Sequence, residues 1–366
     1  MDLSPLYSDL SEDAREEIEA LPRSERLIQI ASLQNRATRE LVAQIAEMVN
    51  LPVLNDEERA KVGTLYKDNP FEARRLGAAL ISSNAAKHLK EHLADKDKTY
   101  APLVYCWRGG MRSNSLAQIL RSVGWRARLL DGGYKTFRSF VSTDTECILS
   151  KPDFRLSVLA GQTGVAKTRL LHTLHSKGAQ IIDLEGLASH RGSVLGLEPN
   201  TQQPGQKHFE TRLWHILSQI DSSRPVFIEA ESNRIGMLHC PPPLWKKLGE
   251  AQVFNIELPL SQRAAFLLDD YPHFTKDSEH LKNLLNRLVK LRGKEQVARW
   301  HELIDSQQWT GFVESVLRDH YDLVYRRAGD EKSNYPAPQE TITMEDFTSL
   351  SLKQASDTLI DCARRS

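Results

Sequence analysis

The chain of 366 residues and 41.5 kDa is long enough to form two domains of ordinary size. Hydrophobic residues make up 40% and charged residues 26%, and 48 basic side chains balance 48 acidic ones, which excludes a disordered chain and a histone-like polycation. No apolar run approaches the length of a membrane span, and the acidic N-terminus does not fit a secretory signal. The four cysteines are too scattered for a disulfide scaffold. We therefore expect a cytoplasmic protein without membrane contact.

The first half of the chain predicts a strand–turn–helix order. We expect a polar helix over Ser11–Leu21, which Pro22 ends, and a long helix over Glu72–Leu93 with leucines near helical spacing. A strand over Pro102–Cys106, a helix over Asn114–Val123 and a second strand over Arg126–Leu130 follow. This alternation favours an α/β fold with a parallel sheet.

A second series of the same kind begins near Arg155. The predicted strands are Leu156–Ala160, Ile181–Leu184, Val226–Glu229 and Val253–Glu257, with a helix over Arg169–Ser176, mostly helical sequence over Ser261–Tyr325 and a helix over Met344–Arg365. A loss of periodicity and Pro152 indicate a boundary near residues 145–154. We therefore expect an acidic extension at 1–24, one domain at 25–145, a second at 146–328 and a polar tail with a helix at 329–366.

The balanced total charge hides an uneven distribution. Residues 1–60 carry thirteen acidic side chains against six basic ones, whereas residues 101–140 carry seven basic ones against Asp131, and residues 278–300 carry six basic ones against two acidic. The middle and late segments therefore favour an anionic partner, although solvated helix faces would have the same composition.

A cysteine begins a glycine-rich turn between a predicted strand and a predicted helix. Backbone N–H groups and a helix N-terminus favour a thiolate at Cys106, while Arg108 and Arg112 supply positive charge for a tetrahedral anion. Gly109 and Gly110 let the backbone curl around such an anion. The pattern predicts a catalytic set of Cys106, Arg108 and Arg112; the alternative is a buried structural cysteine. The C-x5-R spacing also occurs in cysteine phosphatases, which usually have histidine where this chain has Tyr105.

A phosphate-binding loop follows the strand at Leu156–Ala160. Gly161, Thr163, Gly164, Lys167 and Thr168 fit the pattern of a loop whose N–H groups cradle phosphate, whose lysine reaches terminal oxygens and whose threonine offers a hydroxyl to Mg²⁺. Ala166 stands where that pattern has glycine, and its methyl group would lie where phosphates approach the backbone. We expect Thr168, Asp183 and Glu229 to face the metal, although each carboxylate could instead cap a helix or pair with arginine.

Longer segments around both loops resemble a known family. Residues 50–67, Tyr105–Ser113 and Leu130–Lys135 resemble the rhodanese half of bacterial tRNA 2-selenouridine synthases, and 183–193, 206–210 and 229–236 resemble their P-loop half. The resemblance implies a rhodanese-like parallel-sheet domain followed by a P-loop α/β domain with a helical C-terminal part.

The resemblance also implies a reaction at the wobble uridine of tRNA. Geranyl diphosphate alkylates the sulfur of 2-thiouridine, and selenium from selenophosphate then replaces the alkylated sulfur, which leaves more easily than a thiocarbonyl. Cys106 would lie nearest the selenium, and the loop at 161–168 would hold a diphosphate with Mg²⁺.

Aromatic and basic residues alternate after the cysteine loop. This pattern suits an unstacked anticodon-loop base and its phosphates. The candidate RNA-binding residues are Trp125, Arg126, Arg128, Lys135, His190 and Arg191. Ordinary packing would account equally well for Trp125. For His190 and Arg191 the alternative is a core or capping role.

Two departures from the family pattern leave alternatives open. Gln29 and Ala31 replace an Asp-x-Arg pair that helps to support the active loop, and Ala166 replaces a glycine. The alternatives are therefore a geranyl- or sulfur-transferase only, a phosphatase or arsenate reductase, and a degenerate tRNA-binding homologue. No pattern specifies an oligomeric state.

Overall fold

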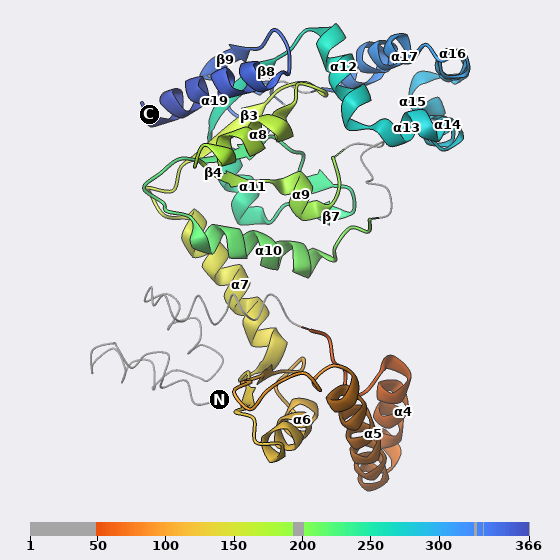
Figure 1. Ribbon diagram of the computed structural model, residues 1–366, viewed down its shortest axis with the longest axis vertical. Coiled ribbons are helices and arrows are strands. Elements are labelled where there is room, and N and C mark those ends of the chain that lie inside the picture. Colours follow the sequence, from red (N-terminus) through yellow and green to blue (C-terminus); the bar gives the residue numbers. More distant parts are fainter. Residues whose placement is uncertain (1–48, 193–200, 326–327, 332, 366) are drawn as a thin grey trace. The chain divides into compact units, whose positions relative to one another are not determined.

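The computed structural model describes residues 49–192, 201–325, 328–331 and 333–365. The predicted extension at 1–24, the predicted helix Ser11–Leu21, and Gln29 and Ala31 lie outside the described residues. The chain divides into two compact units, one ending at Asp144 and the other beginning at Thr145. Figure 1 shows the chain as a mixture of helices and strands, which confirms the predicted α/β class.

The described part of the first unit is mostly helical. Its elements are α4 Asp56–Asp68, α5 Pro70–Glu91, β1 Leu103–Val104, α6 Met111–Ser122, β2 Arg128–Leu129 and α7 Gly133–Leu149. β1 and β2 pair in parallel, with Leu103 opposite Arg128. Both predicted strands are therefore present, but only two residues of each pair. The rhodanese-like architecture predicted for 25–145 stays a prediction.

Local sequence explains where these helices begin. Asn55 caps α4 in a reciprocal arrangement with Glu58, and Asn69 caps α5 directly before Pro70, whose missing N–H is no loss in the first turn. Helix α6 begins at Met111, three residues earlier than expected, because the glycine at 110 ends the turn. Helix α7 was not predicted, and it continues past residue 145 to Leu149.

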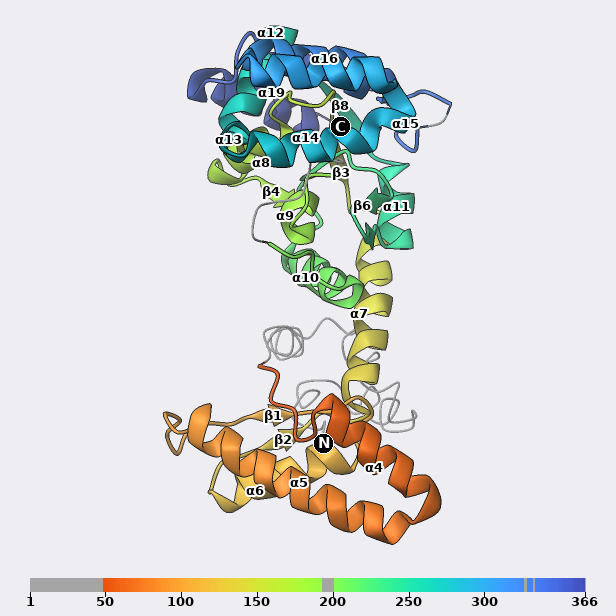
Figure 2. The same cartoon turned by 90° about the vertical axis from the view of Figure 1, so that its right-hand side faces the viewer.

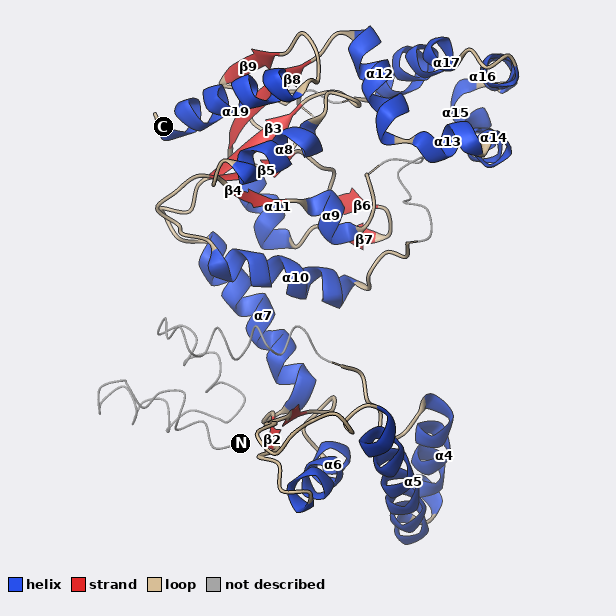
Figure 3. Ribbon diagram, in the orientation of Figure 1, coloured by secondary structure: helices blue, strands red, loops and turns tan. Residues whose placement is uncertain are grey.

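The second unit is built on a five-stranded sheet (Figure 3). Its elements are β3 Leu156–Ala160, α8 Lys167–Ser176, β4 Gln180–Ile182, α9 Leu184–Ala188, α10 Gln206–Gln219, β5 Val226–Glu229, β6 Arg234–Ile235, β7 Leu238–His239, α11 Pro242–Leu248, β8 Gln252–Glu257, α12 Leu260–Asp270, α13 Pro272–Lys276, α14 Ser278–Leu285, η2 Asn286–Leu288, α15 Val289–Arg292, α16 Lys294–Asp305, α17 Trp309–Val316, the π-helix η3 Leu317–Tyr321, α18 Asp322–Val324, β9 Glu340–Thr343 and α19 Ser349–Arg364. The four predicted strands and the helical stretch from 261 to 325 are confirmed.

The order of the strands fixes where a ligand can bind. The sheet runs β4-β5-β3-β8-β9 and all its pairs are parallel. From β3 the chain continues to β4 and β5, which lie on one side of β3 in the sheet. It then continues to β8 and β9, which lie on the other side of β3. In such sheets, ligands bind beyond the carboxyl ends of the strands where the direction reverses. The turn after β3 lies at that point.

Alternate residues of each strand pack on opposite faces of the sheet. Val158 and Ile228 contact the core beneath α9, α10 and α11, whereas Leu159 and Phe227 contact α8, α12 and α19. Because both faces are covered, the strands consist of continuous apolar runs. This explains why they were recognisable in the sequence.

The C-terminal segment belongs to this unit. Residues 329–366, predicted as a polar tail, contribute β9 as the fifth strand beside β8, and α19 packs on α8. The helix begins at Ser349, five residues later than predicted, with Thr348 as its cap. Helices α12 to α17 gather beside the sheet (Figure 1; Figure 2). Within the described residues, no helix is both long and apolar enough to cross a membrane.

Two candidate anion-binding sites

The first site is the turn between β1 and α6. Its cysteine sulfur, Cys106 Sγ, accepts hydrogen bonds from the backbone N–H of Gly110 at 3.2 Å and from the hydroxyl of Ser113 at 3.3 Å. Gly110 is also the residue from which α6 starts, and no side chain caps that helix. The sulfur therefore lies at the positive end of a twelve-residue helix.

The surroundings of Cys106 favour its thiolate. Partial burial opposes ionisation, but the hydroxyl of Ser113 and the backbone N–H groups of Ser113, Arg108 and Gly110 together hold the pKa of Cys106 below its usual range. Ser113 was not among the predicted site residues. It lies in the first turn of a helix after a cysteine loop, a position whose hydroxyl can reach back to the sulfur.

A pair of glycines supports this loop from beneath. A Cβ atom at Gly133 would meet the carbonyl oxygen of Cys106 at 2.2 Å, and Gly133 also has a left-handed φ of 66°. The following residues, Tyr134 and Lys135, donate backbone hydrogen bonds to the carbonyls of Cys106 and Trp107. The Gly132-Gly133 turn is thus required for the first turn of α7 to lie against the cysteine loop.

An open hollow of about 440 Å³ lies over the cysteine. Arg108, Arg112, Trp107, Gly110 and Met111 line it with Cys106. Within the described part of the chain, neither arginine forms an ion pair. A cysteine whose pKa is lowered, beside two guanidinium groups without ion pairs and inward N–H groups, suits a tetrahedral anion of a few atoms.

The second site is the turn after β3, at the reversal point of the sheet. Gly161 has φ 149°, and a Cβ there would lie 2.5 Å from the carbonyl oxygen of Ile256; at Gly164, with φ 87°, a Cβ would crowd Arg263. The turn can form only with glycine at both positions. The Lys167 ammonium donates to the carbonyls of Gly161 at 2.8 Å and Gln162 at 3.4 Å, so it lies folded over the loop.

Ala166 occupies a glycine-like conformation. Its φ is 60° and its ψ 30°, in the left-handed region, immediately before α8. Its methyl group is buried in the core formed with Val165 and Leu170. The methyl group thus packs into the core, and its effect on phosphate binding stays a prediction. The substitution acts on backbone conformation, with a cost of about 1–2 kcal/mol.

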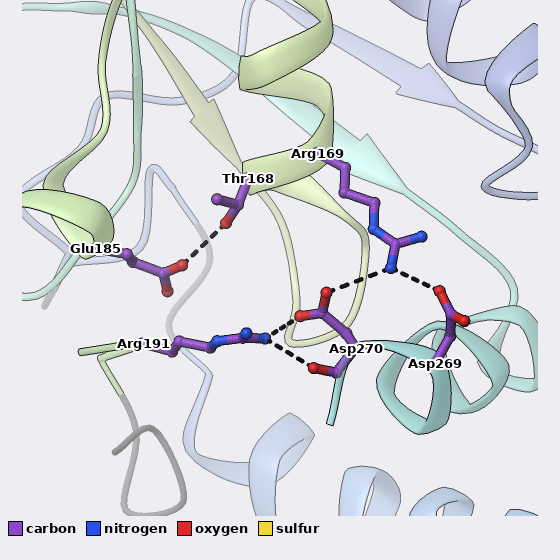
Figure 4. Close-up of polar contacts among 6 residues, drawn as sticks. All are labelled: Thr168, Arg169, Glu185, Arg191, Asp269 and Asp270. Carbon is purple, nitrogen blue, oxygen red and sulfur yellow. Dashed lines mark hydrogen bonds and ion pairs between the residues drawn. The ribbon is translucent and has the colours of Figure 1, made fainter. Parts of the chain in front are cut away.

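The hydroxyl of Thr168 pairs with a carboxylate that the sequence analysis missed. Thr168 Oγ1 donates to Glu185 Oε2 at 2.9 Å (Figure 4). Asp183, the predicted partner, instead caps α9 through Gly186 and contacts His172 at 2.8 Å. An aspartate three residues before a glycine at a strand end is typical of a helix cap. This pattern favours Glu185 over Asp183 as the carboxylate that contacts Thr168.

Glu229 lies behind Glu185 in the same cluster. Its Oε1 accepts a hydrogen bond from the backbone N–H of Glu185 at 2.9 Å, and its buried Oε2 has no hydrogen-bond partner among the described residues. Burial raises the pKa of Glu229 well above its ordinary value, and burial likewise raises the pKa of Glu231 to about 8. Burial also lowers the pKa of Lys167, whereas the three carboxylates oppose that change. The loop thus combines one ammonium with carboxylates that are easily neutralised.

The residues described hold no group of three or more His, Cys, Asp and Glu side chains that could bind a metal by themselves. Mg²⁺ commonly binds through one or two protein oxygens together with substrate phosphates. The hydroxyl of Thr168 and the carboxylate of Glu185 fit that partial donor set, and the third predicted ligand, Asp183, is engaged elsewhere.

Ion pairs enclose the side of the loop next to α12. Arg169 contacts Asp269 at 2.6 Å and Asp270 at 3.4 Å, and Arg191 reaches Asp270 from the opposite side (Figure 4). The guanidinium of Arg191 also lies 4.3 Å from the ring centre of Tyr271. Arg191 is thus part of the wall of this site.

The other predicted RNA-binding residues separate into two groups. Trp125 is buried in the core of the first unit, where its indole N–H donates to the carbonyl of Asp97 at 2.7 Å, so it is a core residue and not a platform for a base. His190 is also buried, and its Nδ1 accepts from the N–H of Gly192. Arg126, Arg128 and Lys135 are exposed.

A family model and several curated relatives agree on the family of this chain. Residues 154–342 match the family model described as the tRNA 2-selenouridine synthase AAA domain. A protein from Marinobacter nauticus named tRNA 2-selenouridine synthase is 32% identical over 75% of this chain and 82% of its own length. Proteins of the same name from Nitrosomonas europaea (36% identical; 61% and 58%) and Alcanivorax borkumensis (33%; 76% and 85%) are also similar. No solved structure matches.

Proposed function

The chain belongs to the tRNA 2-selenouridine synthase family, and on this premise we propose that it is a transferase that converts wobble 2-thiouridine of tRNA to 2-selenouridine. The proposed substrates are geranyl diphosphate and selenophosphate, with an S-geranylated uridine between the two steps. The observation that carries the proposal is the occurrence, in one chain, of a thiolate site and a phosphate loop, each directly before a helix.

The phosphate loop is the proposed site of geranyl transfer. The diphosphate lies on the N–H groups of 161–168, where Lys167 turns from the carbonyl of Gly161 to the terminal oxygens. The thiouridine sulfur attacks the first carbon of the geranyl group, a C–S bond forms, and the C–O bond to diphosphate breaks. Thr168 and Glu185 would hold Mg²⁺, which neutralises charge on the departing diphosphate.

The hollow over Cys106 is the proposed site of selenium transfer. Arg108 and Arg112 bind the trianionic donor, and the N–H groups of the turn hold its oxygens. The selenium adds at C2 of the uridine and geranylthiolate leaves; water then cleaves the P–Se bond and releases phosphate. We place Cys106 nearest the selenium at this centre; it forms no covalent bond in these steps.

The exposed cations of the first unit support tRNA binding. Arg126, Arg128 and Lys135 are exposed and form no ion pair among the residues described, so they are available to phosphates. Binding that depends on such contacts weakens steeply with salt. Replacing all three by glutamine should lower tRNA affinity about tenfold or more at low salt, and by less at high salt.

Nucleoside mass spectrometry tests the proposal directly. A 2-thiouridine tRNA is incubated with the protein, MgCl₂, geranyl diphosphate and selenophosphate, and each small substrate is omitted in turn. We expect selenouridine only with both substrates, geranylated thiouridine in Cys106→Ser, and neither product in Lys167→Met. Ser115→Ala is the control, because the Ser115 hydroxyl donates to the carbonyl of Met111 and to no other group among the described residues.

Other results identify the alternatives. Geranylated thiouridine as the final product of the wild-type protein would indicate a geranyltransferase only. Binding of tRNA without any product would indicate a degenerate tRNA-binding homologue. Selenation that persists in Cys106→Ser would remove Cys106 from the reaction.

A further inference from the structure

An apolar chamber adjoins the phosphate loop and shares Tyr271 with the wall of that site. Its walls come from α12, α13, α14, α17 and η3, and they consist mainly of large apolar side chains. Representative lining residues are Leu267, Phe274, Leu281, Trp309, Phe312 and Val313. The space amounts to about 70 Å³, and we refer to it as the slot.

The chamber opens at the phosphate loop itself. Thr163, in the middle of the loop, is one of its lining residues. Arg263 fixes this junction: it donates to the carbonyl of Thr163 at 2.8 Å and forms a two-pronged ion pair with Asp322 at 2.6 and 3.0 Å. The loop and the helices that form the slot are therefore held together by one buried arginine.

Charge is distributed to match a ligand with two unlike ends. On the loop side lie Lys167 and Arg191, and Arg191 stacks on Tyr271, which itself lines the slot. Apart from Thr163, Thr275 and the two tyrosines Tyr271 and Tyr321, the lining is leucine, phenylalanine, valine and tryptophan. An anionic head on the loop would place an attached apolar tail at the mouth of the slot.

We infer that this chamber binds the linear isoprenoid chain of a prenyl diphosphate and limits the length of chain that the enzyme accepts. The inference rests on the proposed diphosphate site at the loop. Each added five-carbon unit gains binding free energy as long as it enters the slot, because apolar surface leaves water. A chain longer than the slot gains nothing further.

Titration calorimetry with the full-length protein and MgCl₂ measures this dependence. The ligands are inorganic diphosphate, dimethylallyl diphosphate, geranyl diphosphate and farnesyl diphosphate. We expect affinity to rise about tenfold or more at each step up to geranyl diphosphate and no further for farnesyl diphosphate. Trp309 lines the slot, so its fluorescence should be quenched by the prenyl ligands but not by inorganic diphosphate. This quenching should be lost in Trp309→Phe.

A substitution that fills the slot should weaken binding of the apolar tail without affecting binding of the diphosphate head. Val313 lies in the lining and is half-buried, so Val313→Trp should weaken geranyl diphosphate at least tenfold and leave inorganic diphosphate unchanged. Val324→Trp is the matched control, since Val324 is 55% exposed and outside the lining. Retained binding of inorganic diphosphate also shows that the variant is folded.

Two results would overturn the inference in distinguishable ways. If inorganic and geranyl diphosphate bind equally well, or if Val313→Trp binds geranyl diphosphate as the wild type does, the slot does not hold the chain and the loop site still stands. If none of the four ligands binds, the proposed diphosphate site fails and the inference fails with it.

Discussion

Replacing Ser113 by alanine removes one identified cause of the low pKa of Cys106. The serine hydroxyl lies 3.3 Å from the sulfur and 3.0 Å from the carbonyl oxygen of Gly110. It has a single proton, which it gives to the sulfur when that sulfur is a thiolate. A hydrogen bond to a charged group contributes about 1.5–3 kcal/mol. The low end applies to a half-exposed site, and it corresponds to about one pKa unit.

Alkylation by iodoacetamide between pH 5 and pH 10 measures this shift. The rate follows the thiolate fraction, so its midpoint is the pKa of the thiol. The modified peptide that contains Cys106 is quantified by mass spectrometry, because Cys147 and Cys362 are also accessible. In Ser113→Ala the midpoint should rise by about one unit, so that less thiolate is present at neutral pH.

The serine two residues further along α6 provides a matched control. The hydroxyl of Ser115 bonds the carbonyl of Met111 and not the sulfur, so Ser115→Ala should leave the midpoint unchanged. An unchanged midpoint in Ser113→Ala would refute the reasoning. The low pKa of Cys106 would then come from backbone N–H groups and the helix end alone.

Three further substitutions test the loops. Gly133→Ala should collapse the cysteine loop and abolish alkylation of Cys106 near neutral pH. The control is Gly124→Ala, which also has a positive φ but has no atom within 4 Å of the new Cβ, so it should leave this alkylation unchanged. Equal effects of the two substitutions would contradict the argument from crowding at Gly133. Ala166→Gly relieves about 1–2 kcal/mol of left-handed strain but loses about 0.8 kcal/mol of methyl burial and about 0.4–1 kcal/mol of unfolded-state entropy. Its unfolding free energy in urea should therefore change by less than about 1 kcal/mol, and a loss above about 2 kcal/mol would disprove this balance. Arg263→Met leaves Asp322 without its ion-pair partner and should lower the unfolding free energy by about 3 kcal/mol. Adding Asp322→Asn to this variant should lower the unfolding free energy little further. If the losses of the two single variants add up in the double variant, the pair is not coupled.

Much of the fold could be predicted because buried strands and glycine turns have strong local signals. Val226, Phe227 and Ile228 are apolar on both faces of the sheet, and the strand that they predict is present. Helix α7 was missed because glycines at its start suggested a strand end, and contacts with the cysteine loop decide where it begins. Strand β9 was missed because its polar residues face outward at the edge of the sheet and only Ile342 is buried.

The candidate sites were predictable to the extent that their residues are close in sequence. The cysteine loop and the phosphate loop are each a single turn, so spacing alone brought their members together. The carboxylate facing Thr168 comes from a different strand connection, and the sequence offers both Asp183 and Glu185 there. Only the cap formed by Asp183 decides between them. The apolar slot is built from helices whose lining residues run from Leu267 to Tyr321, so no local pattern could reveal it.

The position of β9 has a consequence for how the protein is made. The sheet begins at Leu156 but lacks its outer strand until residues 340–343 have left the ribosome, and α19 covers α8 only afterwards. Until then β8 is an unpaired edge, open to pairing with another chain. Expression of a fragment that ends near residue 328 should therefore yield aggregates, and during translation the nascent second unit is a natural client for chaperones.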